Sequence, residues 1–110
     1  NMSALWMKFD DHGNSLGKKH YTNGPNQTGL SITNTSSGGT AWVGERKKLV
    51  GSKWQYTAIF YKLQGTMITN RSSYPYGNSA ARSIELTKDG GFIIADGSNV
   101  IKTDSDMKIP

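Results

Sequence analysis

The chain has 110 residues, enough for one modest domain with a single core and too few for a second independent domain. It is 35 % hydrophobic with a mean hydropathy of −0.57, and it is rich in Gly, Ser, Thr and Asn, a composition typical of short strands joined by many turns. The absence of cysteine excludes disulfides and thiolate metal sites, and the net charge of +5 gives only a weak bias toward anionic partners.

Apolar and basic runs are both short. A typical apolar run, residues 92–95, is far below the roughly 20 residues that a membrane-spanning helix needs. The densest basic cluster, Arg46-Lys47-Lys48 with Lys53 nearby, is too short to indicate nucleic acid. We therefore expect no membrane span and no nucleic-acid partner.

In chain order, the sequence predicts strands grouped as two, then four, then about three, and no segment has helical periodicity. The first pair, residues 5–9 and 16–21, flanks residues 10–14, whose Asp, Gly and Asn favour a tight turn. The next four predicted strands lie within residues 30–39 and at 41–44, 59–63 and 68–74. The last three are residues 82–86, 92–95 and 100–104. Pro is absent from every strand interior, as paired strands require.

One unit repeats along the chain. Residues 30–39 and 82–91 share Ser-Ile-x-x-Thr-x-x-Gly-Gly, and Ser31 and Ser83 define an offset of 52 residues. We expect each Gly-Gly pair to form a hairpin turn, because glycine reaches positive φ without steric cost. Residues 5–9 correspond in the same way to 59–63. Repetition of a four-stranded unit that cannot bury both its faces alone is typical of a propeller or another β-repeat array.

Residues 81–95 resemble the repeat of bacterial secreted and surface β-propellers, whose blades combine Ser-Ile, Thr and Asp-Gly-Gly with an aromatic residue and an apolar pair. Residues 6–10 with Gly13-Asn14 are similar to the Trp-containing strand and Gly-Asn turn that follow in that family. The chain departs from this pattern at Asp96 and at Ser37, which stand where the family usually has Gly and a turn Asp. Residues 45–56 look like an insertion, and we expect them to form a surface loop.

The resemblance implies an all-β fold of antiparallel four-stranded β-propeller-type blades within a single domain, residues 1–110. Residues 1–28 would be an outer half-blade, 29–74 a complete blade and 75–110 a partial blade. About two blades cannot close a ring, since propellers generally need four or more. We therefore expect further blades from the same chain or from identical subunits, and the sequence looks like part of something longer. A small β-sandwich is the alternative.

The resemblance further implies that the connections between blades share one rim with residues 45–56, opposite the Gly-Gly hairpins. This rim would collect aromatic and amide side chains, which suit contact with carbohydrate or protein. The candidate ligand-binding residues are Trp54, Tyr56, Tyr74, Tyr76, Asn26 and Arg46. In the alternative interpretation, the Tyr residues close the ends of neighbouring blades and the Asn residues serve turns.

The sequence favours a non-catalytic binding or scaffolding module that contacts a glycan or a protein, and the resemblance implies a secreted or cell-surface location. The alternative is a hydrolase or lyase with acid-base carboxylates such as Glu45, Asp96 or Glu85. Binding is favoured because no convergent catalytic set is visible and neither His12 nor His20 has a partner at metal spacing. We predict no catalytic residue, no metal and no cofactor.

Overall fold

The computed structural model describes residues 4–21, 26–65, 67–74, 80–97 and 99–109, and over these residues the protein is all-β, with no helix that could span a membrane. The strands are β1 (Ala4–Phe9), β2 (Ser15–Tyr21), β3 (Gln27–Asn34), β4 (Thr40–Val50), β5 (Lys53–Gln64), β6 (Met67–Tyr74), β7 (Ala81–Leu86), β8 (Phe92–Asp96) and β9 (Val100–Thr103). They form antiparallel sheets of two, four and three strands, each in sequence order. The predicted all-β class and the predicted strand grouping are thereby confirmed.

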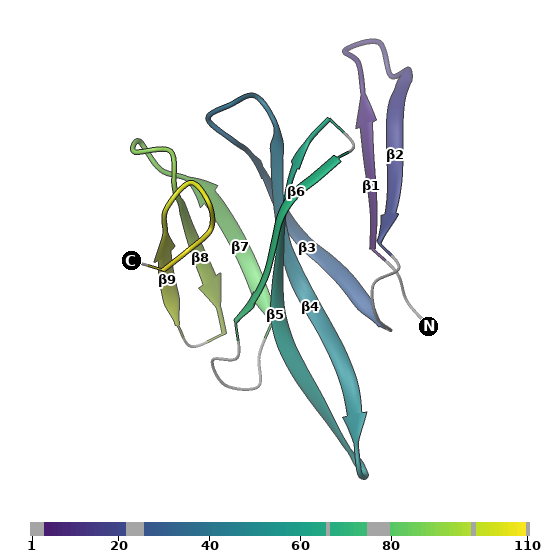
Figure 1. Ribbon diagram of the computed structural model, residues 1–110. Helices are drawn as coiled ribbons and strands as arrows, with labels where there is room; N and C mark the ends of the chain where they lie inside the picture. The colour runs from purple at the N-terminus through teal and green to yellow at the C-terminus, as the bar shows by residue number, and fades with distance from the viewer. Residues whose placement is uncertain (1–3, 22–25, 66, 75–79, 98, 110) are drawn as a thin grey trace.

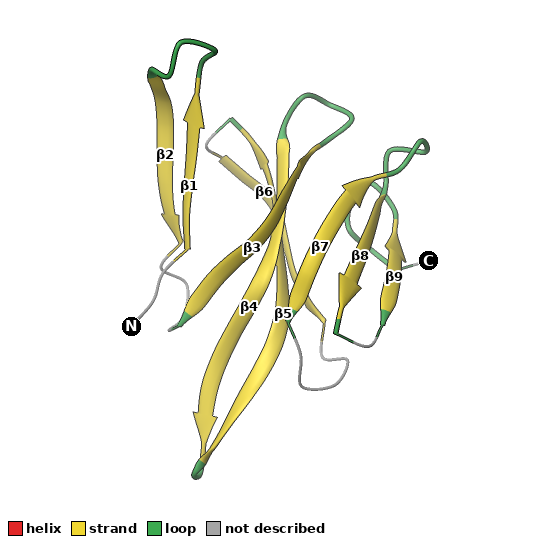
Figure 2. Ribbon diagram, turned by 180° about the vertical axis from the view of Figure 1, so that it is seen from behind, coloured by secondary structure: helices red, strands yellow, loops and turns green. Residues whose placement is uncertain are grey.

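The four-stranded sheet lies between the other two, as Figures 1 and 2 show from opposite sides. Each of its faces packs into a separate hydrophobic cluster. Toward β7–β9 the cluster comprises Ala41, Val43, Ala58, Phe60, Ala81, Ile84, Phe92, Ile94, Ile101 and Met107. Toward β1–β2 it comprises Ala4, Trp6, Trp42, Ile59, Tyr61 and Leu63, with Ile68 packed against them.

Strand alternation explains this double burial. Successive side chains of a strand point to opposite faces, and paired residues of neighbouring strands share a face. Val43 is paired with Phe60 and faces β7–β9, whereas Trp42 is paired with Tyr61 and faces β1–β2. The Trp42 and Tyr61 rings stack with centroids 4.7 Å apart. A sheet that is apolar on both faces needs a covering sheet on each side, and this sheet has both.

Four turns share one geometry, namely residues 10–14, 35–39, 87–91 and 104–108. In each, the first residue's N–H donates to the fifth residue's carbonyl at 2.8–3.0 Å, and the fourth residue's N–H donates to the first residue's carbonyl at 3.0–3.2 Å. The fourth residue is left-handed, with φ of 83° at Gly13, 85° at Gly38, 85° at Gly90 and 68° at Met107. This is the three-residue hairpin loop with a G1 bulge. In the last of these turns, Met107 stands where the others have Gly.

The two glycines of each Gly-Gly pair are required for different structural reasons, namely a positive φ at the first and close backbone approach at the second. Gly38 supplies the positive φ, as predicted. Gly39 has no positive φ, and a Cβ there would lie 2.2 Å from the carbonyl oxygen of Leu63 on the neighbouring strand. In the second copy, a Cβ on Gly91 would lie 2.1 Å from the carbonyl oxygen of Thr103. The second glycine therefore allows close approach of two backbones.

The turn at residues 87–91 also holds a carboxylate. Asp89 accepts hydrogen bonds from the Thr87 hydroxyl and, at 3.0 Å, from the Gly91 N–H, and its other oxygen lies 3.0 Å from Lys102 Nζ on β9. These donors hold the pKa of Asp89 well below its usual range, with the Thr87 hydroxyl making the largest contribution.

Residues 45–56 do not form a loop, and that prediction was wrong. Strands β4 and β5 stay paired from Thr40↔Leu63 to Val50↔Lys53 without a register shift, so the segment is the outer half of one long hairpin. The pairing persists because only Gly51 and Ser52 separate the two strands, and a two-residue loop fixes the register. Figure 1 shows this hairpin reaching beyond the neighbouring strands, at the end opposite the turns at 10–14, 35–39 and 87–91.

Candidate functional site

The projecting end of the β4–β5 hairpin, residues 45–58, is the candidate functional site. Its tip is tight because Val50 is paired with Lys53 and Gly51 has a φ of 64°. Positive φ at the first of two loop residues is the requirement of a type II′ turn, which matches the twist of the flanking strands. The hairpin can therefore present side chains at fixed positions on two faces.

One face of the hairpin is aromatic and apolar. Leu49 is paired with Trp54, and Lys47 with Tyr56, and the four side chains form what we call the aromatic face. Leu49 is 54 % exposed and Trp54 is 42 % exposed. The Lys47 ammonium lies 4.8 Å from the centroid of the Trp54 ring, within the range of a cation–π contact. Large exposed apolar groups beside a cation suit contact with a partner surface.

The opposite face is basic. Arg46, Lys48 and Lys53 share it, and we call these three residues the basic face. At its inner end lies a hollow of about 250 Å³, here called the arginine hollow, which is lined by Arg46, Ile59, Tyr61, Arg71, Ser72 and Ser73. Register accounts for the meeting of the two arginines, because Arg71 on β6 is paired with Tyr61 on the face that Arg46 also occupies. None of these lining residues is acidic.

The base of the hairpin is anchored to the start of β3. The Lys47 N–H donates to the Asn26 carbonyl at 3.2 Å, and Asn26 itself is left-handed with a φ of 58°. The next residue, Gln27, is only 1 % exposed, and its Oε1 lies 3.5 Å from the Tyr61 hydroxyl. These contacts fix the hairpin to the packed part of the central sheet.

The predicted ligand-binding residues are only partly brought together. Trp54 and Tyr56 lie on the aromatic face, whereas Arg46 lies on the basic face. Asn26 is at the base of the hairpin. Tyr74 ends β6, paired with Ala58, but its side chain lies outside the described part of the structure, as does all of Tyr76. The binding role of these residues stays a prediction.

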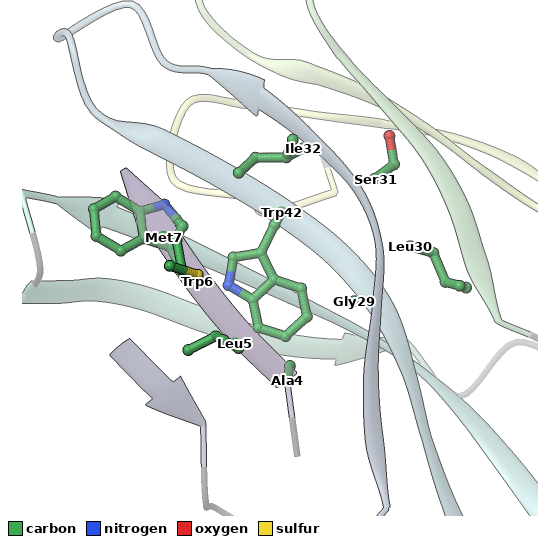
Figure 3. Close-up of a pocket in the computed structure, with 9 residues that line it drawn as sticks. All are labelled: Ala4, Leu5, Trp6, Met7, Gly29, Leu30, Ser31, Ile32 and Trp42. Atoms are coloured by element: carbon green, nitrogen blue, oxygen red, sulfur yellow. The ribbon is translucent and has the colours of Figure 1, made fainter. Parts of the chain in front are cut away.

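A second hollow of about 340 Å³ separates the two-stranded sheet from the edge of the central one (Figure 3). Its walls are Ala4, Leu5, Trp6, Met7, Gly29, Leu30, Ser31, Ile32 and Trp42. The polar groups among these are the Ser31 hydroxyl, which already accepts a hydrogen bond of 3.3 Å from the Ile84 N–H, and the indole N–H groups of Trp6 and Trp42. Ligand sites usually combine apolar walls with several orienting polar groups. Apart from Ser31, these side chains carry no oxygen acceptor and no charge, so we describe this hollow as a gap in the packing between two sheets.

The three carboxylates of the enzyme hypothesis lie on different strands, Glu45 on β4, Glu85 on β7 and Asp96 on β8. Asp96 is 8 % exposed and its carboxylate accepts the Asn99 N–H at 2.7 Å, so it shapes the β8–β9 connection. Within the described ranges, no group of three or more His, Cys, Asp or Glu residues could hold a metal ion. No feature of the described residues favours the enzyme hypothesis over binding.

Sequence reasoning missed Arg71. Its one sequence signal is alternation with Ser73 along β6, which places both on a single face, but nothing local indicates that Arg46 lies on that face too.

Comparison of the chain with protein-family models, with curated proteins and with solved structures finds no match. The site must therefore be interpreted from its own chemistry.

Proposed function

We propose that the chain is a non-catalytic binding module built of β-propeller-type blades, which contacts a glycan or protein partner through the β4–β5 hairpin. The exposure of Leu49 and Trp54 on a hairpin that extends beyond the packed sheets is the main support for this proposal. Neither side chain belongs to the two core clusters of the described residues, and anchors of binding surfaces are enriched in Trp and Tyr. A secreted or cell-surface location rests on the family resemblance alone.

Support for the propeller-type arrangement comes from the order and packing of the sheets. Each sheet is an antiparallel meander, and the three follow one another face to face in chain order (Figure 1). Propellers are built from four-stranded sheets arranged in this manner around an axis. Ser31 and Ser83, which are equivalent in the repeat, lie on β3 and β7, the first strands of two successive sheets. Those strands are in contact through the hydrogen bond from the Ile84 N–H to Ser31.

The outer faces of the two end sheets add to this support. Leu5 and Met7 on β1 correspond in the repeat to Ile59 and Tyr61, which are 2 % and 3 % exposed, yet they are themselves 49 % and 44 % exposed. An apolar position that is buried in one copy of a repeat and exposed in another indicates a missing neighbour.

The last sheet shows the same pattern on its other side. Ile93 is 42 % exposed, whereas Ala41, its equivalent 52 residues earlier (93 − 52 = 41), is fully buried. Val100 is paired with Ala95 and is 76 % exposed, while Phe60, paired with the equivalent Val43, is fully buried. We propose that further sheets of the same repeat, from the same chain or from copies of it, cover both end faces.

Binding is tested on the whole chain with a glycan array and a pull-down from extracellular matrix. We expect Trp54→Ser to weaken the interaction about tenfold or more, since a central Trp anchor typically contributes at least about 2 kcal/mol. The matched control is Met67→Ser, which removes a 70 % exposed apolar side chain from the opposite end of the central sheet. Failure of the wild-type chain in both assays, or equal losses in the two variants, would contradict the proposal.

Assembly is tested by light scattering. A mass above that of one chain supports completion by identical subunits. A compact monomer instead favours the alternative, in which these repeats close a small β-sandwich.

A further inference from the structure

The arginine hollow and the basic face form one continuous cationic surface. Arg46 belongs to both, and Lys48 lies two residues farther along β4 on the same face. Alternate residues of a strand are about 6.7 Å apart, so the cationic groups follow the hairpin in a line. Lys53 extends this line to the tip, where it is paired with Val50.

The two arginines are available to a ligand. Arg46 is half-buried and Arg71 is exposed. The ion pairs found among the described residues are His12 with Asp11 and Lys102 with Asp89, and neither includes a residue of this hairpin. Two guanidinium groups around one hollow repel each other, and a shared oxyanion relieves that repulsion.

The lining of the hollow matches an oxyanion in detail. A guanidinium presents a planar fork of N–H donors that fits a carboxylate, sulfate or phosphate with two parallel hydrogen bonds. Ser73, which is paired with Ile59 on the same face, adds a hydroxyl donor. The floor is formed by Ile59 and Tyr61, which are 2 % and 3 % exposed, and such a low-dielectric floor strengthens a charge interaction above it.

From this arrangement we infer that the arginine hollow binds a sulfate or carboxylate group of an acidic polysaccharide, whose neighbouring acidic groups follow the basic face toward Lys53. The inference rests on the proposed binding role of the hairpin but uses the face opposite Trp54. A polysaccharide is favoured over single-stranded nucleic acid because nucleic-acid grooves combine cations with exposed aromatic rings that stack on bases. Here the exposed ring, Trp54, is on the other face of the hairpin.

The experiment measures binding of the whole chain to immobilised polymers at about 0.15 M salt, where long-range charge effects are screened beyond about 8 Å. Heparin carries both sulfate and carboxylate groups, dextran sulfate carries sulfate only, polygalacturonate carries carboxylate only, and dextran is neutral. Single-stranded DNA represents the competing class of polyanion. We expect binding to heparin and to at least one single-chemistry polymer, which identifies the anionic group, and no binding to dextran.

The double variant Arg46→Gln, Arg71→Gln should weaken binding about tenfold or more, given the strength of charge-assisted hydrogen bonds. The matched control, Arg82→Gln with Lys88→Gln, removes the same charge from exposed positions in β7 and its turn. Equal losses in both double variants would show that net charge alone is responsible and would overturn the inference.

Absence of binding to every acidic polysaccharide, or tighter binding to DNA, would overturn it as well. Thermal unfolding of both double variants verifies that they remain folded. Because Trp54→Ser leaves the hollow intact, loss of partner binding in that variant with retained polyanion binding separates this inference from the proposed function.

Discussion

Replacing Met107 by Gly changes the stability of the fold in two opposite ways, because it relieves backbone strain and removes a buried side chain. Met107 occupies the left-handed position of the fourth repeated turn, where the other three turns have Gly. The backbone alone would favour Gly, since a left-handed residue with a side chain costs about 1–2 kcal/mol. The Met107 side chain, however, is only 1 % exposed and belongs to the cluster that joins the central sheet to β7–β9. Truncation of a buried Met costs about 2–5 kcal/mol.

We therefore expect Met107→Gly to lower the free energy of unfolding by about 1–3 kcal/mol, because the lost packing exceeds the relieved strain. Urea denaturation at fixed protein concentration measures this change, and the melting temperature should fall by about 4–8 °C for each kcal/mol. Gly38→Ala is the control for the backbone effect, because a Cβ at Gly38 meets nothing within 4 Å. A Met107→Gly variant as stable as the wild type, alongside a destabilised Gly38→Ala, would refute the reasoning.

Three further predictions concern other parts of the fold. A Cβ on Gly44 would lie 1.8 Å from the carbonyl oxygen of Thr28, so Gly44→Ala should disrupt β3–β4 pairing and change the near-ultraviolet circular dichroism spectrum. Gly29→Ala is the control and should be tolerated, because its Cβ would meet only the Trp42 ring at 3.6 Å. The lowered pKa of Asp89 means that its carboxylate stabilises the fold above the unfolded-state pKa and that this stability is lost as the pH falls through the folded-state pKa. Acid unfolding of Asp89→Asn should therefore depend less on pH below about 4, the ordinary pKa of Asp, and an unchanged acid profile would contradict this. Met7→Ser should lower any mass above one chain that light scattering detects, and an unchanged assembly would exclude this face from the contact.

Much of the strand pattern could be predicted because its signals are local. The turns at residues 10–14, 35–39 and 87–91 contain Gly at the left-handed position, and the flanking apolar residues mark the strands. The turn at 104–108 has the same hydrogen bonds and begins with an Asp, but its left-handed position lacks Gly because tertiary packing of Met107 overrides the preference for Gly.

The candidate site was harder to predict because its features depend on pairing across strands. The run Arg46-Lys47-Lys48 looks uniformly basic in the sequence and stands within the segment that was expected to be an inserted surface loop. Once β4 is paired with β5, the same run divides between two faces, and Lys47 lies over Trp54. The meeting of Arg46 with Arg71 requires β5 between them, and no local pattern of the sequence contains that information.

Because the pairing of the long hairpin is uninterrupted, alternate residues along each of its strands belong alternately to the aromatic face and to the basic face. Deleting a single residue from β4 would turn the side chains of that strand over relative to β5, so that Lys47 and Leu49 would no longer share a face with Trp54 and Tyr56. Adding two residues to each strand would keep both faces and move the tip outward by about 6.7 Å. Insertions of two residues in each strand can thus change the length of the β4–β5 hairpin while its aromatic and basic faces keep their composition. Insertions of a single residue cannot.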